Sequence, residues 1–268
     1  MTSRSIALIG AGRMGGALAR GWAASTGFSE LSLIEPAPGP AAQAMAETPG
    51  VRLNPDAHPA DIVVVAVKPQ IFADAASGIC SWIGPDSLVL SIMAGVRLRT
   101  LARLLGTDRV VRAMPNTPGA IGRGVSVVCA PRAAPREDIE AARALLAPLG
   151  VVEGPVDEAL MPAITAISGS GPAYAFLLAE ALAAAGEAEG LTADLAARIA
   201  AATVSGAGAL MAESNEAPDA LRRAVTSPGG TTEAALAVLM DENGLPSLLR
   251  KAVRAAADRE RALSGDGE

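Results

Sequence analysis

The first fifteen residues constrain the fold more than any other stretch. A short apolar run, residues 6–9, leads into a glycine turn with the sequence Gly10-Ala11-Gly12-Arg13-Met14-Gly15, and a helical pattern follows as far as Ala24. A strand that ends in G-x-G-x-x-G and continues as a helix is typical of the first unit of a dinucleotide-binding domain. There the first glycine permits the tight turn, the second lets a pyrophosphate approach the backbone, and the third lets helix and strand pack closely. Unpaired N–H groups at the helix start attract the phosphates.

A carboxylate stands in register with this turn. A second apolar run, residues 31–34, ends on Glu35, about twenty residues past Gly15, where a ribose-binding acid belongs in a βαβ unit. The alternative is a glycine-rich turn that binds nothing, with Glu35 as a solvated charge at a strand end. The combination of strand, turn, helix and acid favours dinucleotide binding.

Strand-like and helical segments alternate through residue 153, and only helical segments follow residue 157. Continuous apolar runs such as residues 62–67 are expected in parallel strands that are covered by helices on both faces. The sequence therefore predicts an α/β fold: a Rossmann-like doubly wound parallel sheet in residues 1–155, followed by an all-α C-terminal domain in residues 156–268. The stretch Ala173–Ala185 is apolar nearly all the way round and should be buried on every side. A small helical domain has little interior for it, so we expect this domain to form a homodimer with a second copy.

Charge and cysteine usage exclude several classes of protein. The formal net charge is −6 and the basic residues are dispersed, which argues against nucleic-acid binding. Cys80 and Cys129 have no metal-like spacing, so no metal site is predicted, and we expect buried thiols in a reducing, cytoplasmic compartment. The uncharged stretch of residues 159–179 is broken by Pro162 and by the sequence Ser168-Gly169-Ser170-Gly171-Pro172, so no membrane span is predicted.

Three more loops follow predicted strands at their carboxyl ends, where ligands of open α/β sheets lie. Lys68, in one of these loops, is one of two lysines in the chain, and its alternative role is a solvated loop charge. We expect a nicotinamide dinucleotide to be bound by the glycine turn, by Glu35 and by these loops. The residues are Gly10, Ala11, Gly12, Arg13, Met14, Gly15, Glu35, Ala66, Val67, Lys68, Pro69, Ala94, Gly95 and Asn116.

The proton-transfer groups of many dehydrogenases are missing. His58 is the one histidine and lies in a loop before a strand, Tyr174 has Leu178 in place of a lysine four residues later, and no lysine occurs from Pro69 to Arg250. A protonated imine suits such a site, because it already carries the positive charge that attracts a hydride. The segment 226–232 offers hydroxyls and a helix start for an attached carboxylate. On physical grounds alone, an ordinary capped helix start is an equally good interpretation of that segment.

These segments resemble the pyrroline-5-carboxylate reductase family over nearly the whole chain. The most specific matches are residues 168–174 (SGSGPAY) and residues 226–239, and residues 112–118 (RAMPNTP) also match. The resemblance implies reduction of 1-pyrroline-5-carboxylate to L-proline with NADPH or NADH, the last step of proline biosynthesis. It also implies C-terminal helices that interlock two chains, often within rings of dimers. It places the substrate at Ser227, Gly229, Gly230, Thr231 and Thr232, with the Thr232 hydroxyl on the imine nitrogen as the catalytic group.

The sequence leaves alternatives open for the choice between NADH and NADPH and for the class of reaction. Family members often carry a basic residue after the second strand, suited to a 2′-phosphate, whereas residues 35–39 contain none. We therefore expect NADH to be used at least as well as NADPH, unless Arg13 reaches the 2′-phosphate. A hydroxyacid or β-hydroxyacid dehydrogenase would keep the fold but needs the missing lysine. A cofactor-sensing protein would keep the glycine turn but has no need for residues 227–232.

Overall fold

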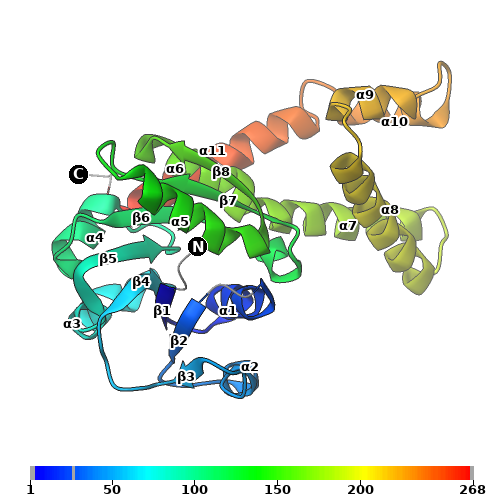
Figure 1. Cartoon of the computed structure of the whole chain (residues 1–268). Helices are drawn as coiled ribbons and strands as arrows, with labels where there is room; N and C mark the ends of the chain where they lie inside the picture. The colour runs from blue at the N-terminus through cyan, green and yellow to red at the C-terminus, as the bar shows by residue number, and fades with distance from the viewer. Residues whose placement is uncertain (1–3, 26–27, 266–268) are drawn as a thin grey trace. The chain divides into compact units, whose positions relative to one another are not determined.

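The computed structural model describes residues 4–25 and 28–265, and the chain divides into two compact units (Figure 1). The first unit extends to Gly169 and resumes at Ala256, and the second comprises Ser170–Ala255. This division differs from the expected boundary after residue 155. The intervening segment belongs to the first unit because Met161 and Ala166 are buried, Met161 in a cluster with side chains of the sheet.

An eight-stranded sheet forms the centre of the first unit, in the order β3-β2-β1-β4-β5-β6-β7-β8. The strands are β1 (Arg4–Ile9), β2 (Phe28–Ile34), β3 (Val51–Leu53), β4 (Ala60–Val65), β5 (Ile83–Ser91), β6 (Val110–Met114), β7 (Gly124–Cys129) and β8 (Gly150–Val156). All neighbouring strands are parallel except β6 and β7. The predicted doubly wound sheet is confirmed from β1 to β6. Strand β7 reverses because only a short turn, η2 (Thr117–Ile121), joins it to β6, and a parallel crossover needs a longer connection.

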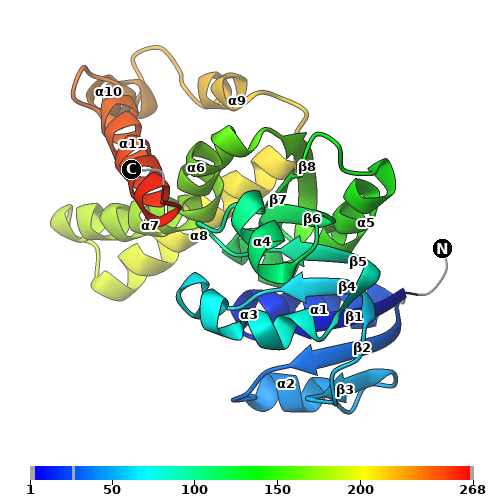
Figure 2. The same ribbon diagram turned by 90° about the vertical axis from the view of Figure 1, so that its left-hand side faces the viewer.

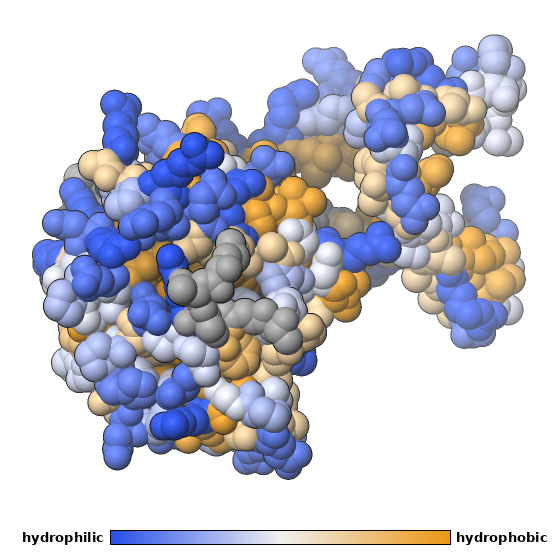
Figure 3. Space-filling model, in the orientation of Figure 1, coloured by the Kyte–Doolittle hydropathy of each residue, from blue (hydrophilic) through white to orange (hydrophobic). Residues whose placement is uncertain are grey.

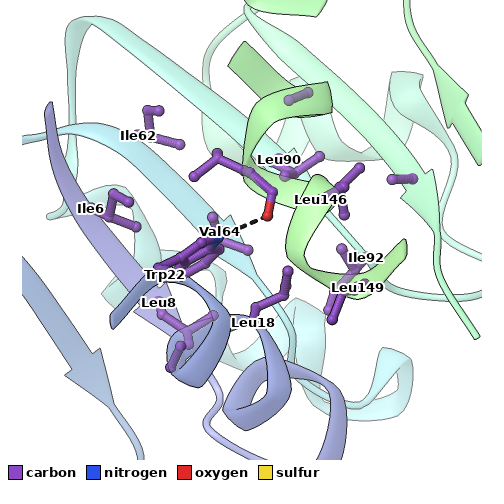
Figure 4. Packing of buried hydrophobic residues seen from close by; sticks show 14 of the residues in the cluster. Ile6, Leu8, Leu18, Trp22, Ile62, Val64, Leu90, Ile92, Leu146 and Leu149 are labelled. Atoms are coloured by element: carbon purple, nitrogen blue, oxygen red, sulfur yellow. Dashed lines mark hydrogen bonds between the residues drawn. The ribbon is translucent and has the colours of Figure 1, made fainter. Parts of the chain in front are cut away.

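Helices cover both faces of the sheet (Figure 2). On one face, α1 (Arg13–Ser25) and α5 (Arg136–Leu146) pack against alternate residues of the strands, such as Ile6 and Leu8 of β1. On the other face, α3 (Phe72–Cys80) and α4 (Leu98–Leu105) pack against the residues between them, such as Ala7 and Ile9. The central strands are thus buried on both sides, as their continuous apolar runs predict. In the first cluster, the Trp22 indole donates a hydrogen bond to the Leu145 carbonyl at 2.7 Å (Figure 4).

Short elements connect the sheet to the loops at its edge. These are α2 (Pro40–Met45), η1 (Pro69–Ile71), η3 (Ala147–Leu149), η4 (Glu158–Leu160), α6 (Met161–Ile164) and the π-helical turn η5 (Thr165–Gly169). The sequence predicts a single helix over residues 159–167, whereas the structure divides this stretch into η4, α6 and η5. Pro162 at the start of α6 supplies no backbone N–H to extend a helix from η4.

The second unit is entirely helical in its described residues. Its elements are α7 (Gly171–Ala188), α8 (Ala193–Glu213), α9 (Pro218–Ala224), α10 (Thr231–Leu239) and the first part of α11 (Leu245–Leu263), which ends in the first unit. Helices α7 and α8 pack against each other, and a side chain on Gly186 would meet the Ala196 Cβ at 3.3 Å.

This unit buries few of its own apolar side chains. Helices α7 and α10 contain no buried residue, and Phe176 and Leu177 of α7 are 68% and 61% exposed. Figure 3 shows hydrophobic residues at the surface of this unit. The single chain therefore leaves the stretch Ala173–Ala185 exposed. The burial expected for this stretch requires a second copy of the chain. Among the described residues, α8 alone has the length and apolar composition of a membrane-spanning helix, which is weak support for a span.

Candidate functional site

The glycine turn lies between the carboxyl end of β1 and the start of α1. Gly10 has φ +97°, a conformation that favours glycine, and a Cβ there would lie 2.8 Å from the Ala66 carbonyl oxygen. A Cβ on Gly15 would collide with the Gly10 carbonyl oxygen, so the third glycine allows helix and strand to meet. At Gly12 a Cβ would meet nothing within 4 Å. The turn is therefore closed by protein at Gly10 and Gly15 and open at Gly12, where a phosphate could approach.

Glu35, at the end of β2, is half-buried and turned toward this glycine turn. Its Oε2 accepts a hydrogen bond from the Ala11 backbone N–H at 2.9 Å, and its Oε1 accepts one from the Ala37 N–H at 3.3 Å. The alternative in which Glu35 is a solvated strand-end charge does not describe this geometry. The carboxylate lies at the carboxyl edge of the sheet beside the turn.

Asn54 is a residue of this region that the sequence analysis missed. It follows β3 directly, has φ +48°, and forms hydrogen bonds with the backbone of Glu35 through its side chain. An asparagine directly after a short strand could have signalled it, because asparagine is enriched among residues with positive φ.

A cavity of about 490 Å³ opens next to the glycine turn. It lies between α1, α2 and η2, and its lining includes Gly12, Arg13, Arg20, Met45 and Thr117. Arg13 and Arg20 are exposed at its edge and are the basic residues of the lining.

The two loops after β4 and β5 lie at the same edge of the sheet. The Ala66 N–H donates to the Ile9 carbonyl, which brings the loop of residues 66–69 against the glycine turn. Lys68 is exposed in this loop, at the start of η1. Ala94 and Gly95 follow β5, and Gly95 has φ +71°.

Asn116 joins two of the family-like motifs within the first unit. Its Oδ1 accepts the Val125 N–H at 2.9 Å, and its Nδ2 donates to the Ser168 carbonyl at 3.2 Å. A side chain on Gly169 would lie 2.7 Å from the Met114 Cε, so the loop after β6 and the π-helical turn fit closely together. The Asn116 amide thus fixes this junction, and one N–H of its Nδ2 remains for a ligand.

The segment 226–232 forms a tight turn and the start of α10 in the second unit. The Gly230 N–H donates to the Ser227 carbonyl at 3.0 Å, and the Gly229 N–H donates to Glu233 Oε2 at 2.7 Å. Thr231 and Thr232 are the first residues of α10, so their N–H groups have no partner within the helix. Thr232 is half-buried and Thr231 is exposed. The start of α10 can therefore offer the backbone N–H groups of Thr231 and Thr232, and a threonine hydroxyl, to a small anion.

The chain's one histidine lies elsewhere. The His58 ring packs on Trp82, with centroids 5.3 Å apart, and its Nε2 lies 3.4 Å from Glu30 Oε1. His58 precedes β4, so it lies toward the amino ends of the strands, away from the glycine turn. In residues 4–25 and 28–265, no group of three or more histidine, cysteine, aspartate and glutamate side chains could hold a metal ion.

The sequence analysis also did not identify a buried cluster of charged side chains centred on Arg112 of β6. The Arg112 side chain is 2% exposed and pairs with Glu260 at 2.9 Å and with Glu158 at 3.4 Å. Cys129 lies opposite Arg112 in the β6–β7 pairing. Burial, with a further contribution from the Glu158 carboxylate, raises the pKa of the Cys129 thiol to about 12.

Comparison with known proteins decides the family. Over 266 residues the chain is 37% identical to the pyrroline-5-carboxylate reductase of Pisum sativum, covering 98% of this chain and 97% of that protein. The chain belongs to the pyrroline-5-carboxylate reductase family. Residues 158–263 match the family described as pyrroline-5-carboxylate reductase dimerisation, and residues 5–95 match the family described as NADP oxidoreductase, coenzyme F420-dependent. The family resemblance drawn from the motifs is confirmed.

Solved pyrroline-5-carboxylate reductases share the fold. The enzyme of Coxiella burnetii superimposes with a TM-score of 0.89 at 33% identity, covering 98% of this chain and 99% of that one. The enzyme of Plasmodium falciparum, solved with NADP bound, superimposes with a TM-score of 0.81 at 28% identity over the same shares. The predicted class, a Rossmann-like sheet followed by a helical domain, is confirmed.

Proposed function

We propose that this protein reduces 1-pyrroline-5-carboxylate to L-proline with NADH or NADPH, the final step of proline biosynthesis. The single observation that carries the proposal is family membership over 98% of the chain. The geometry of each unit supports it, because the first unit has an open glycine turn at the edge of a Rossmann-like sheet and the second has a helix start with free donors.

The first unit supplies the cofactor site in this proposal. The open backbone at Gly12 and the N–H groups that begin α1 suit a pyrophosphate, and Glu35 suits the adenosine ribose. When bound, the reduced nicotinamide supplies the hydride. The loops after β4, β5 and β6 complete the site. The residues that we assign to the cofactor remain Gly10, Ala11, Gly12, Arg13, Met14, Gly15, Glu35, Ala66, Val67, Lys68, Pro69, Ala94, Gly95 and Asn116.

The second unit supplies the substrate groups. The N–H groups of Thr231 and Thr232 in the first turn of α10 bind the substrate carboxylate, because a helix start favours an anion. The Thr232 hydroxyl hydrogen-bonds the imine nitrogen, so that the C=N carbon is oriented to accept hydride. The nitrogen carries the proton of the iminium form, so no strong general acid is required. The residues that we assign to the substrate are Ser227, Gly229, Gly230, Thr231 and Thr232.

The exposed apolar helices support a homodimer. The match to the dimerisation family covers residues 158–263. The exposed apolar side chains of α7 and α10 lie within this range. A second copy of the chain would remove these side chains from water, which is the main driving force for obligate association. The same association accounts for the apolar composition of α8. We propose a dimer or a ring of dimers, acting in the cytoplasm without nucleic acid or membrane as a partner.

Cofactor choice follows from the charge near Glu35. Residues 36–43 contain no basic side chain that could offset repulsion between this carboxylate and a 2′-phosphate. We therefore propose that NADH is used at least as well as NADPH. Arg13, at the edge of the cavity beside the turn, is the group that could reverse this preference.

A direct assay tests the reaction. Purified protein is mixed with reduced nicotinamide cofactor and one acceptor at a time, and loss of the reduced cofactor is followed by absorbance. We expect turnover with 1-pyrroline-5-carboxylate and none with a 2-keto acid. Equal turnover with the keto acid, or formation of reduced cofactor when a 3-hydroxy acid is mixed with the oxidised cofactor, would identify a hydroxyacid-type dehydrogenase instead. Cofactor binding without turnover of any acceptor would identify a sensing protein.

A further inference from the structure

We propose that Asn54 is a positioning residue for coenzyme choice: its side-chain amide fixes Glu35 so that the carboxylate stays directed at the adenosine ribose. This inference rests on the proposed function, in which Glu35 reads the ribose of the cofactor. It assigns no contact between Asn54 and the cofactor.

The Asn54 amide binds both polar groups of the Glu35 backbone. Its Oδ1 accepts the Glu35 N–H at 2.8 Å, and its Nδ2 donates to the Glu35 carbonyl at 2.9 Å. The Asn54 N–H itself donates to the Leu33 carbonyl at 2.8 Å. Together these bonds continue the pairing of β2 with β3 past the last residue of β3. Glu35 is thereby fixed from one side by an asparagine that lies 19 residues later in the chain.

The backbone of Asn54 is unusual. Its φ of +48° is positive, and no other non-glycine residue in the described part of the chain has a positive φ. Asparagine adopts this conformation more readily than most residues, but it still costs free energy relative to an ordinary backbone. Asn54 adopts this costly conformation while its side chain bonds to Glu35. We take this as a sign that the position of Glu35 has to be fixed.

The requirement is the direction of the Glu35 side chain. With its backbone fixed, the carboxylate bonds to the N–H groups of Ala11 and Ala37, and each oxygen retains a lone pair for a ribose hydroxyl. A carboxylate free to rotate could move away from a 2′-phosphate and relieve the repulsion. A fixed carboxylate cannot, so discrimination against the 2′-phosphate depends on how rigidly Glu35 is held.

A purely structural role for Asn54 makes a different prediction. If the amide only ties β3 to β2, its removal lowers stability and affects both cofactors alike. If it positions Glu35, its removal changes the ratio of kcat/KM for NADH to kcat/KM for NADPH, and only while Glu35 is present. A double-mutant cycle separates the two roles.

The variants are Asn54→Gly, Glu35→Ser and the double variant, compared with the wild type. Glycine adopts φ +48° without strain, so Asn54→Gly removes the amide and leaves the backbone conformation accessible. Asn215→Gly, in the exposed loop between α8 and α9, is the matched control. Thermal unfolding establishes that each variant is folded, and the affinities for NADH and NADPH are also measured by titration without substrate.

We expect Asn54→Gly to shift the NADH:NADPH ratio about tenfold toward NADPH, with the KM for 1-pyrroline-5-carboxylate unchanged. In the Glu35→Ser background the same change should leave the ratio unmoved. An equal shift in both backgrounds, or no shift in the wild-type background, overturns the positioning role. If Glu35→Ser itself leaves the ratio unchanged, the role of Glu35 in the proposed function fails, which is a separate result.

Discussion

Arg112 on β6 and Glu260 on α11 form a buried ion pair, with Nη2 and Oε1 2.9 Å apart and the two side chains 2% and 4% exposed. The second oxygen of Glu260 accepts a hydrogen bond from the Ser264 hydroxyl at 3.1 Å. Glu158 also approaches Arg112 and accepts the Leu98 N–H at the start of α4. The guanidinium thus joins a central strand, the segment after β8 and the end of α11 within the first unit.

Removing one partner of this pair should destabilise the protein strongly. Glu260→Ala leaves the Arg112 charge buried without its closest partner, so we expect the free energy of unfolding to fall by about 3–5 kcal/mol. Arg112→Met combined with Glu260→Met should cost less, because the carboxylate that then loses its cation, Glu158, is 29% exposed and keeps its hydrogen bond from the Leu98 N–H. Urea unfolding followed by circular dichroism measures both. Asp194→Ala breaks the exposed pair with Arg198 and should change stability by less than about 1 kcal/mol.

The buried thiol of Cys129 should give a dependence of stability on alkaline pH. Its pKa rises from 9.0 to about 12 in the folded protein. Between these values the unfolded chain releases the proton and the folded chain keeps it, so the free energy of unfolding falls as the pH increases. Cys129→Ala should be less stable at every pH because of the cavity, but its stability should fall less steeply above pH 9. An identical slope for wild type and Cys129→Ala would show that this thiol does not contribute, and Cys80→Ala serves as the control.

Two glycines of the same turn should respond differently to alanine. Gly12→Ala places a methyl group in open space, so the unfolding temperature without cofactor should stay the same while the affinity for NADH falls at least tenfold. Gly15→Ala pushes a methyl group against the Gly10 carbonyl and should lower the unfolding temperature itself. Thermal unfolding with and without NADH distinguishes these effects. Unchanged NADH affinity in Gly12→Ala would argue against a pyrophosphate at this position.

Thr232→Val tests the hydroxyl that we assign to the imine nitrogen. We expect kcat/KM for 1-pyrroline-5-carboxylate to fall roughly tenfold to a hundredfold, or about 1.4–2.7 kcal/mol of transition-state stabilisation, with cofactor affinity nearly unchanged. Thr203→Val is the matched control, because that hydroxyl bonds to the Ile199 carbonyl of its own helix. Wild-type kinetics in Thr232→Val would remove this residue from the mechanism.

The proposed homodimer can be tested by introducing a charged side chain on the exposed face of α7. Phe176→Asp places a carboxylate where we expect a second chain, so the variant should elute as a monomer or aggregate and lose activity. Val151→Asp makes the same kind of change at an exposed apolar residue of β8, which is 59% exposed, and should leave the oligomer intact. Light scattering at micromolar concentration measures the mass. A wild-type monomer that is stable and active would contradict the proposed dimer.

Local patterns predicted much of the fold, together with the position of Glu35 beside the glycine turn. The glycine turn and Glu35 could be placed because spacing along one βαβ unit fixes their relation. Asparagine directly after a short strand hints at a special backbone conformation at Asn54, but the sequence gives no sign of its hydrogen bonds to Glu35, 19 residues earlier. Arg112 was hidden for the same reason: a charged residue in an apolar strand gives no sign of a partner 148 residues away. The reversal of β7 depends on the length of one connection, which periodicity does not report.

The division of the chain has a consequence for synthesis. The whole second unit, Ser170–Ala255, is an insertion in the sequence of the first, which resumes at Ala256. A ribosome therefore translates the second unit before it makes Glu260, the partner of Arg112. Until then the central strand β6 holds a charge whose main partner does not exist. The nascent dinucleotide-binding unit must remain incomplete while the helices that follow it emerge, so the two units cannot mature strictly one after the other.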